Sequence, residues 1–323
     1  MSTLKDVAVL ANVSPITVSR VINTPDLVKP GTRLKVQKAM DQLQYSPNIP
    51  AKNLVTKRSG IINVYIPENM DLSNPFSMHF IAGVSQGLGE NMYSFLLLRD
   101  RKIETACDGY IVTGLEHREI YEFDDFARKR NRPIVLFGHT DIEAIDCIDI
   151  DNVAGAFMAT EYLIRNGHRK IAMINVNENR DYVTDRLNGY RKALDEYDIP
   201  YRKKRVIYAE NNIHGGIKAV EQLLESDRPT AIFCATDTMA IGVSRALSDA
   251  GLKIPEDISL IGYDGLGHQL LITPHLTTIR QPVIQAGRLM AETLLQRLQG
   301  NPADRIVRMI CPELLEGDSV AAI

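Results

Sequence analysis

From residue 59 onward, short apolar runs alternate with amphipathic stretches that have helical spacing. This alternation is typical of βαβ units, in which helices cover both faces of a parallel sheet. A body of about 265 residues exceeds one compact sheet, so we expect an α/β fold with two doubly wound lobes. The apolar runs are Ile61–Ile66, Phe95–Leu98, Tyr110–Val112, Ile134–Phe137, Ile171–Ile174, Val206–Tyr208, Ala231–Cys234 and Ile258–Ile261. The amphipathic stretches include Phe157–Arg165, Tyr190–Glu196, Ile217–Leu224 and Met239–Ala250.

Residues 5–23 read KDVAVLANVSPITVSRVIN and predict two short helices joined by a tight turn. Asn12 tolerates a positive φ, Ser14 is a good N-cap, and Pro15 suits the first position of a helix. This pattern predicts a helix-turn-helix, whose second helix can enter a DNA major groove, although two core helices of a small bundle would look similar. The residues expected to face inward are Val7, Ala8, Leu10 and Ala11, then Val18, Val21 and Ile22.

A third helix is expected over Pro30–Leu43, and the whole N-terminal segment is basic. Residues 1–58 hold nine Lys and Arg against three Asp, a net charge of +6, whereas the remainder carries −9. A basic head on an acidic body fits a polyanion-binding module attached to a sensor, with chance clustering of solvated charges as the alternative. The expected core stripe of the third helix is Leu34, Val36, Ala39, Met40 and Leu43.

Composition excludes several other classes of protein. No apolar run approaches the roughly 20 residues that span a bilayer, and the N-terminus lacks the apolar segment of a secretory signal. We therefore expect a cytoplasmic protein. The four cysteines are far apart, and neither they nor the seven histidines have metal-ligand spacing. We expect reduced, mostly buried thiols, no metal and no cofactor.

The run A-x-x-A-N-V-S-P-x-T-V-S-R-V-I-N at residues 8–23 resembles the N-terminal signature of the LacI/GalR (lactose-repressor) family of bacterial transcription regulators. Further matching motifs extend the resemblance over essentially the whole chain, among them Tyr45-Ser46-Pro47-Asn48, Asn74-Pro75-Phe76, Cys234-Ala235-Thr236-Asp237 and Leu276-Thr277-Thr278-Ile279. The resemblance implies a homodimeric repressor in which a small molecule, a sugar or sugar derivative, binds between two lobes like those of periplasmic sugar-binding proteins.

The resemblance also implies the domain boundaries. Residues 1–46 would form the DNA-binding headpiece, 47–58 a hinge, and 59–323 the effector-binding and dimerisation domain. One lobe would comprise about 59–150 with 282–310, and the other 151–281 with the C-terminal tail. The chain would cross between the lobes near Asp149–Asn152, Arg280–Pro282 and Cys311.

In the family, the hinge folds as a short helix that pairs with its dimer mate and wedges a leucine into the minor groove. Leu54 sits at that position here. An eight-residue helix over Ile49–Thr56 is shorter than the roughly 12–15 residues that give marginal stability in water, so it should fold only when DNA and the partner bury it. Pro50 departs from the usual hinge sequence, and a plain flexible linker is the alternative.

A second departure lies between Leu98 and Asp108. A crossover between parallel strands normally needs a dozen or more residues, usually a helix, and family members have one here. The shorter connection predicts either that the lobe covers this face of its sheet differently or that an edge is exposed. It also puts ligand contacts near Arg99 and Asp100 in doubt.

The start of the second helix should read DNA. Pro15 and Ile16 have no side-chain donor, so they can make only apolar contacts or exclude bases by shape, whereas Arg20 can bind guanine O6 and N7 bidentately. Thr3, Ser19 and Asn23 are candidate phosphate contacts. The full set of predicted DNA contacts is Thr3, Ser14, Pro15, Ile16, Thr17, Ser19, Arg20, Asn23 and Leu54.

Ligands of two-lobed α/β proteins bind at the carboxyl ends of the strands. Planar amide, carboxylate and guanidinium groups there would suit a polyhydroxyl ligand, with Phe76 as an apolar wall. Asp237 could instead cap a helix, and Arg186 could be a surface ion pair. The family's frequent aromatic near residues 211–214 is absent. The predicted effector contacts are Asn74, Phe76, His139, Arg186, Asp237, Asp264 and Gln281.

Three other functions are weighed against a sugar-controlled repressor. A sugar transport receptor would share the body but would need a signal peptide and would not need the basic head. A regulator controlled by a protein corepressor stays open. An enzyme is not expected, because nucleotide-binding, serine-hydrolase and zinc-protease motifs are missing from the sequence.

Overall fold

The computed structural model describes residues 2–23, 27–45, 58–100, 105–226, 228–300 and 304–323. Most of the expected hinge, including Leu54, lies outside these residues. The chain divides into two compact units, Met1–Gly60 and Ile61–Ile323. Among the described helices, none has the length and apolar character to cross a membrane.

The smaller unit contains three helices, α1 (Leu4–Leu10), α2 (Pro15–Asn23) and α3 (Pro30–Gln42). Asn12 adopts φ 50° in the turn between α1 and α2. The Ser14 hydroxyl accepts a hydrogen bond from the backbone N–H of Thr17 at 3.1 Å, which caps α2. The predicted helix-turn-helix is therefore confirmed. Its core consists of Val7, Ala8, Ala11, Val18, Val36, Ala39 and Met40.

Two residues expected in this core are instead exposed, Leu10 at 48% and Leu34 at 59%. Successive residues of a helix are rotated by about 100°. Leu10 therefore lies about 100° from the centre of the buried stripe of α1, and Leu34 lies almost opposite the buried stripe of α3. The prediction placed both leucines in the core because they are apolar. Their angular distance from the buried residues of each helix explains why they are exposed.

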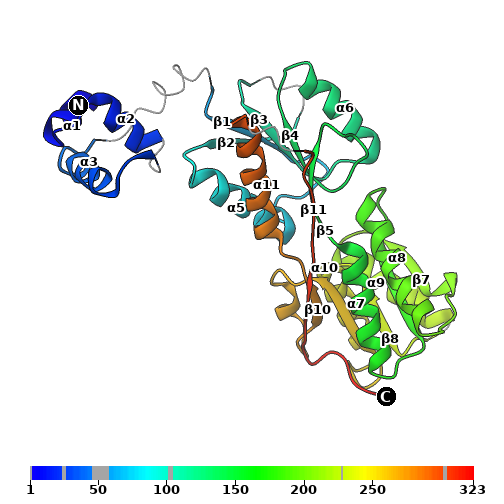
Figure 1. Ribbon diagram of the computed structural model, residues 1–323. Helices are drawn as coiled ribbons and strands as arrows, with labels where there is room; N and C mark the ends of the chain where they lie inside the picture. Colours follow the sequence, from blue (N-terminus) through cyan, green and yellow to red (C-terminus); the bar gives the residue numbers. More distant parts are fainter. Residues whose placement is uncertain (1, 24–26, 46–57, 101–104, 227, 301–303) are drawn as a thin grey trace. The chain divides into compact units, whose positions relative to one another are not determined.

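The first lobe of the larger unit is built on a parallel sheet with strand order β11-β5-β4-β3-β1-β2 (Figure 1). Helices α5 and α11 pack against each other and cover one face, and α6 contributes to the apolar cluster on the other. The strands are β1 (Ile61–Tyr65), β2 (Ser94–Leu98), β3 (Gly109–Val112), β4 (Ile134–Phe137), β5 (Asp146–Ile150) and β11 (Val307–Ile310). The helices are α5 (Pro75–Gly89), α6 (His117–Arg128) and α11 (Val283–Leu298).

The second lobe has the order β12-β10-β9-β8-β6-β7, in which only β12 runs antiparallel to its neighbour. Helices α7 and α8 pack together as one pair, and α9 and α10 as another. The strands are β6 (Ile171–Val176), β7 (Val206–Ala209), β8 (Ala231–Cys234), β9 (Ser259–Asp264), β10 (Thr277–Arg280) and β12 (Glu313–Leu315). The helices are α7 (Asn152–Arg165), α8 (Asp181–Glu196), α9 (Ile213–Ser226) and α10 (Asp237–Asp249), with short 3-10 turns η2 (Lys203–Arg205) and η3 (His268–Leu271).

The two lobes share the chain. It leaves the first sheet after β5, returns to it between β10 and α11, and passes back to the second sheet between β11 and β12. Each lobe is therefore assembled from segments far apart in the sequence, and both sheets present the carboxyl ends of their parallel strands toward the region between them (Figure 1).

Residues 101–104 of the short connection after β2 lie outside the described residues, so how the connection covers the sheet stays a prediction. β2 is the edge strand of its sheet, and Leu96 on it is 40% exposed. The Asn63 amide of β1 donates to the Thr105 hydroxyl at 2.9 Å, so the return segment crosses β1 close to the sheet. α6 leaves β2 largely uncovered because its apolar contacts centre on β3 and β4, including Tyr110 and Leu136.

The crossing of α5 and α11 depends on glycine at position 83. A Cβ built on Gly83 would lie 2.1 Å from the Ile284 carbonyl oxygen, a backbone atom that cannot move aside cheaply. We expect Gly83→Ala to lower the free energy of unfolding by about 1–3 kcal/mol, measured by urea denaturation.

Gly89 lies on the same helix and provides a matched control. A Cβ there would have no neighbour within 4 Å. Gly89→Ala should leave the stability unchanged or raise it by up to about 1 kcal/mol, because alanine favours helix more than glycine does. Equal destabilisation by the two substitutions would contradict the close approach of α5 and α11.

Candidate functional site

A pocket with a cavity volume of about 250 Å³ lies between the two lobes. Six of the seven predicted effector residues line it, namely Asn74, Phe76, His139, Arg186, Asp264 and Gln281. Its lining comes from the carboxyl ends of strands in both sheets, including Gly138 after β4 and Thr236 after β8. The volume is near the lower end of the roughly 300–1,000 Å³ typical of ligand pockets, so it suits a small molecule.

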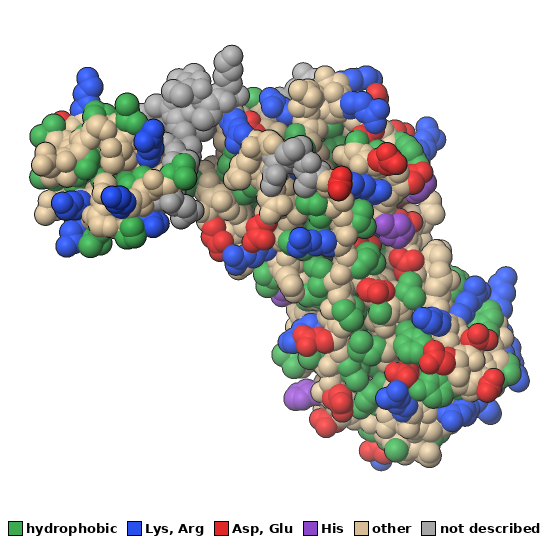
Figure 2. All heavy atoms as spheres, viewed as in Figure 1, with side chains coloured by type: hydrophobic (Ala, Val, Ile, Leu, Met, Phe, Trp, Pro, Cys, Tyr) green, Lys and Arg blue, Asp and Glu red, His purple; other side chains and the backbone are tan. Residues whose placement is uncertain are grey.

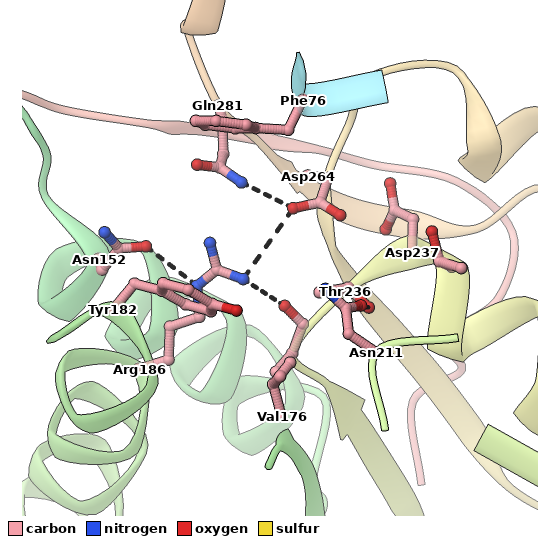
Figure 3. Close-up of polar contacts among 12 residues, drawn as sticks. Phe76, Asn152, Val176, Tyr182, Arg186, Asn211, Thr236, Asp237, Asp264 and Gln281 are labelled. Carbon is pink, nitrogen blue, oxygen red and sulfur yellow. Dashed lines mark hydrogen bonds and ion pairs between the residues drawn. The ribbon is translucent and has the colours of Figure 1, made fainter. Parts of the chain in front are cut away.

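The Arg186 side chain is the most extensively held group of the pocket (Figure 3). Its Nε donates to the Asn152 side-chain oxygen at 3.0 Å, and its Nη1 donates to the Ala235 carbonyl oxygen. The guanidinium carbon lies 3.8 Å from the centre of the Tyr263 ring and 4.8 Å from that of Tyr182. Arg186 is only 4% exposed, so the alternative of a surface ion pair is wrong.

Asp264 and Gln281 form a second polar pair on the same wall (Figure 3). Gln281 Nε2 donates to Asp264 Oδ1 at 2.7 Å, and the same oxygen lies 4.0 Å from Arg186 Nη1. Asp264 has φ 136°, a conformation that costs free energy for a residue with a side chain and that concentrates at functional sites. This strained backbone aims the carboxylate at the pocket.

Phe76 supplies the opposite, apolar wall from the first lobe (Figure 3). Its ring packs edge-on against Phe137, with centroids 5.2 Å apart, and stacks on Phe80 at 6.1 Å. Asn74 caps α5, because its side-chain oxygen accepts from the backbone N–H of Phe76 at 2.9 Å. The Asn74 amide nitrogen is the part of this residue that a ligand could use.

His139 joins the lobes at the edge of the pocket. Its Nδ1 lies 3.4 Å from Asp149 of the first lobe, and its Nε2 lies 3.5 Å from Asp181 of the second. The hydrogen bond to Asp149 is the largest cause that raises the pKa of His139 to about 9, and Asp181 and Asp185 add to it. The imidazole is therefore a cation at neutral pH.

Asp237 is the one predicted effector residue that does not line the pocket. Its carboxylate accepts from the Thr278 hydroxyl at 2.6 Å and from the backbone N–H of Gly265 at 2.8 Å. It is 1% exposed and lies behind Asp264. The cap of α10 is Thr236, whose hydroxyl accepts from Met239 N–H, so the capping alternative for Asp237 is also wrong. Asp237 holds the β9–η3 loop and β10 in place.

Several lining residues were not predicted, among them Asn69, Asn152, Glu178, Arg180, Asp181, Tyr182 and Asn211. Asn152 lies two residues after β5, where the chain was expected to cross between the lobes, and this position near a strand end was a usable signal. Asn211 lies in the segment that lacks the family's aromatic, and it accepts from the Thr236 hydroxyl at 2.9 Å. Tyr182 precedes Arg186 by four residues on α8, and this i,i+4 spacing, which places the two side chains on one helix face, was a usable signal.

The doubt about Arg99 was justified, since Arg99 is absent from the pocket lining. Its guanidinium donates instead to the carbonyl oxygens of Glu68 and Met70, at 2.8 and 2.7 Å. It therefore supports the loop that brings Asn69 and Met70 to the pocket.

The candidate DNA-reading surface is the start of α2. Pro15, Ile16 and Arg20 are exposed there, Ile16 by 65%, while Thr17 and Ser19 are half-buried. Lys and Arg side chains spread over the visible face of the N-terminal unit (Figure 2). The Asn23 side chain lies outside what the structure describes. An apolar tip followed by one guanidinium can make few direct hydrogen bonds to bases.

Some predicted DNA contacts are already engaged in helix caps. Thr3 and Asp6 form a reciprocal capping box at the start of α1. The Ser14 and Thr17 hydroxyls lie 2.8 Å apart. A hydroxyl can donate one bond and accept another, so these side chains keep some capacity for phosphate.

Two family models match the chain. That of the bacterial regulatory proteins of the lacI family matches residues 3–48, and that of the periplasmic binding protein-like domain matches residues 160–320. The chain is 34% identical to the uncharacterized HTH-type transcriptional regulator YvdE of Bacillus subtilis over 99% of both proteins. It is 34% identical to the ribose operon repressor of Haemophilus influenzae over 94% of this chain and 93% of the relative.

Solved structures agree with these matches. A complex of the transcriptional regulator CelR with cellobiose superposes with a TM-score of 0.76 and 30% identity, covering 99% of this chain and 100% of the other. The lac repressor dimer bound to operator and the anti-inducer ONPF gives a TM-score of 0.75 and 27% identity, with 99% of both chains covered.

The buried Asp237 links stability to pH. Burial and, next, the Asp264 carboxylate raise the pKa of Asp237 from 3.8 to about 7. Between about pH 4 and 7 the folded state then retains a proton that the unfolded state has lost, so the free energy of unfolding falls as pH rises through this window. We expect the free energy of unfolding of Asp237→Asn to fall less steeply than that of wild type between about pH 4 and 7, measured by urea denaturation.

The exposed Asp195 on α8 provides the control, and Asp195→Asn should keep the wild-type slope. If Asp237→Asn and wild type lost stability equally steeply with pH, the proton on Asp237 would not be linked to folding.

Proposed function

The chain belongs to the LacI family of bacterial regulatory proteins. We propose that it is a transcription repressor and that a small polyhydroxyl effector, bound between its two lobes, controls its affinity for operator DNA. The observation that carries this proposal is the pocket between the lobes, where Arg186, Asp264 and Gln281 of one lobe face Phe76 of the other. The planar donors and acceptors suit pairs of hydroxyl groups, and the aromatic wall opposite them suits the apolar face of the ring that carries those hydroxyls.

The proposed division of labour follows the chain. Residues 1–46 read the operator, 47–58 act as the hinge, and 59–323 bind the effector and dimerise. Rotation of the lobes would change the spacing of the two hinges and hence their ability to fold, with Leu54 in the minor groove. The coupling free energy is expected to be on the order of 1–3 kcal/mol and to be reciprocal, so that operator DNA alters effector affinity by the same factor.

A homodimer fits both the proposed operator and the surface of the larger unit. A pseudo-palindromic operator needs two headpieces related by a two-fold axis. Leu270 and Leu271 of η3 are 64% and 69% exposed, and large adjacent apolar side chains of this kind are typical of an interface. A chromosomal operator would place the protein in the cytoplasm.

We infer that the pocket binds its ligand without converting it, because the similar proteins named above are transcriptional regulators or repressors. Within the described residues, no group of His, Cys, Asp and Glu is arranged to hold a metal ion. Measurable turnover of any bound ligand would contradict this inference.

The central experiment is a thermal-shift screen of the full chain against mono- and disaccharides, followed by an operator-binding assay with each hit. We expect at least one sugar to raise the melting temperature and to change operator affinity. A protein corepressor would be favoured if no small molecule altered operator binding while a cell extract did.

Operator recognition is tested at Arg20. Losing a bidentate contact to guanine should cost about 1–3 kcal/mol on the operator, whereas affinity for random DNA should change little. Arg20→Ala is therefore expected to lower the specificity ratio, measured by fluorescence anisotropy on both DNAs. An equal loss on both would identify Arg20 as a phosphate contact instead.

Effector recognition is tested at Arg186. Lysine cannot reproduce the planar fork that contacts Asn152 and the Ala235 carbonyl, so Arg186→Lys should weaken effector binding at least about tenfold by calorimetry. Arg191 is exposed on the same helix, and Arg191→Lys is the matched control. Wild-type affinity in Arg186→Lys would remove Arg186 from the binding site.

A further inference from the structure

Carboxylates outnumber cations among the described residues that line the pocket between the lobes. The lining has five carboxylates, two guanidinium groups and one imidazole. The carboxylates are Asp71, Asp149, Glu178, Asp181 and Asp264, and the cations are Arg180, Arg186 and His139. The lining therefore has more acidic than basic side chains.

Each of these cations already has a carboxylate beside it. Arg180 Nε lies 3.2 Å from Glu178 and its Nη2 donates to Asn69 across the cleft, while Arg186 Nη1 lies 4.0 Å from Asp264. His139 lies between Asp149 and Asp181. A ligand anion entering the pocket would therefore have to compete with a resident carboxylate for any of these cations.

His139 is the most completely neutralised of the three. Both its ring nitrogens lie near carboxylate oxygens, so the imidazolium has its two N–H donors directed at protein groups. Asp149 is only 7% exposed at its side chain, so water screens its charge poorly, and Asp185 adds a further negative charge nearby. Without Asp181, and with Asp149 still raising the pKa of His139, the Nε2 side of this imidazolium would be open to an anion at the rim of the pocket.

Building on the proposed function, we propose that the effector is an uncharged polyhydroxyl molecule, that phosphorylated and carboxylated derivatives are rejected, and that the Asp149–His139–Asp181 bridge sets this preference. The polar groups that remain for the ligand are amides, hydroxyls and the outer face of the Arg186–Asp264 pair, which suit neutral hydroxyls. A phosphate or carboxylate would lie close to the rim carboxylates, and neither lobe would offer it an unshared cation among the described residues.

The test uses the full chain with matched sets of probes: glucose with glucose 6-phosphate and glucuronate, ribose with ribose 5-phosphate, and cellobiose as a neutral disaccharide. Dissociation constants are measured by calorimetry for each set in which one member binds. We expect each anionic derivative to bind at least tenfold more weakly than its neutral parent. An anionic derivative that binds as tightly as its parent, or more tightly, overturns the preference while leaving the sugar effector in place. Binding by none of the probes counts against the sugar effector itself and removes this inference with it.

The bridge is tested by Asp181→Asn, which keeps the shape of the side chain and removes one of the two charges that neutralise His139. Asp181 is 41% exposed, so the variant should fold. We expect the ratio of anionic to neutral affinity to rise at least fivefold, and added salt to reduce this gain. Asp257→Asn is the matched control, because Asp257 is 40% exposed and pairs with Arg228, which does not line the pocket.

An unchanged ratio in Asp181→Asn would show that His139 does not set the preference. A ratio that rose equally in Asp257→Asn would assign the effect to net charge alone and would overturn the role of the bridge as well.

Discussion

The buried guanidinium of Arg186 is the interaction on which the binding lobe depends. Removing a cation from water is costly unless its donors are satisfied and an opposite charge is near. Here α7 supplies Asn152, the end of β8 supplies the Ala235 carbonyl, and β9 supplies Asp264 and the Tyr263 ring. These groups must keep their positions to offset the burial of the charge. Meeting that requirement also fixes the polar wall that faces the ligand.

The contacts that cross between the lobes at the pocket are of a different kind. Arg180 reaches Asn69, and His139 reaches Asp181, by polar contacts at a partly solvated rim. Contacts of this type are weaker than apolar packing and can be replaced by water, so they permit relative motion of domains. Each lobe has its own buried apolar cluster, and Leu266 of the second lobe also packs against the cluster of the first. The lobes can therefore reorient while most of each core stays covered, which a ligand-controlled regulator requires.

Much of this molecule could be predicted from its sequence. The eight apolar runs all lie on strands to within one residue, and most of these strands are buried on both faces, which leaves a continuous apolar signal. β5, β10, β11 and β12 were missed. In β5 and β10, Asp146, Asp149, Thr277 and Thr278 interrupt the signal with buried polar side chains. β11 and β12 are short and partly exposed, so they have no buried apolar run. At the pocket, strand ends identified Asp264 and Gln281. They could not separate Asp264 from Asp237, because which carboxylate faces the ligand depends on the backbone at φ 136°. The His139–Asp181 bridge depends on approach between distant segments.

The way the chain is shared between the lobes bears on its synthesis. β11 completes the first sheet, whereas β12 and the segment beyond it complete the second. In that segment Ser319, Ala321 and Ile323 form hydrogen bonds with Leu260, His168 and Asn166, respectively. On the ribosome, α1 to α3 can assemble early, because their core is contained within about 45 residues. The first lobe must wait for β11, which ends at Ile310, and the second for the segment that includes Ser319, Ala321 and Ile323. The nascent protein therefore acquires its DNA-reading fold well before it can respond to any effector.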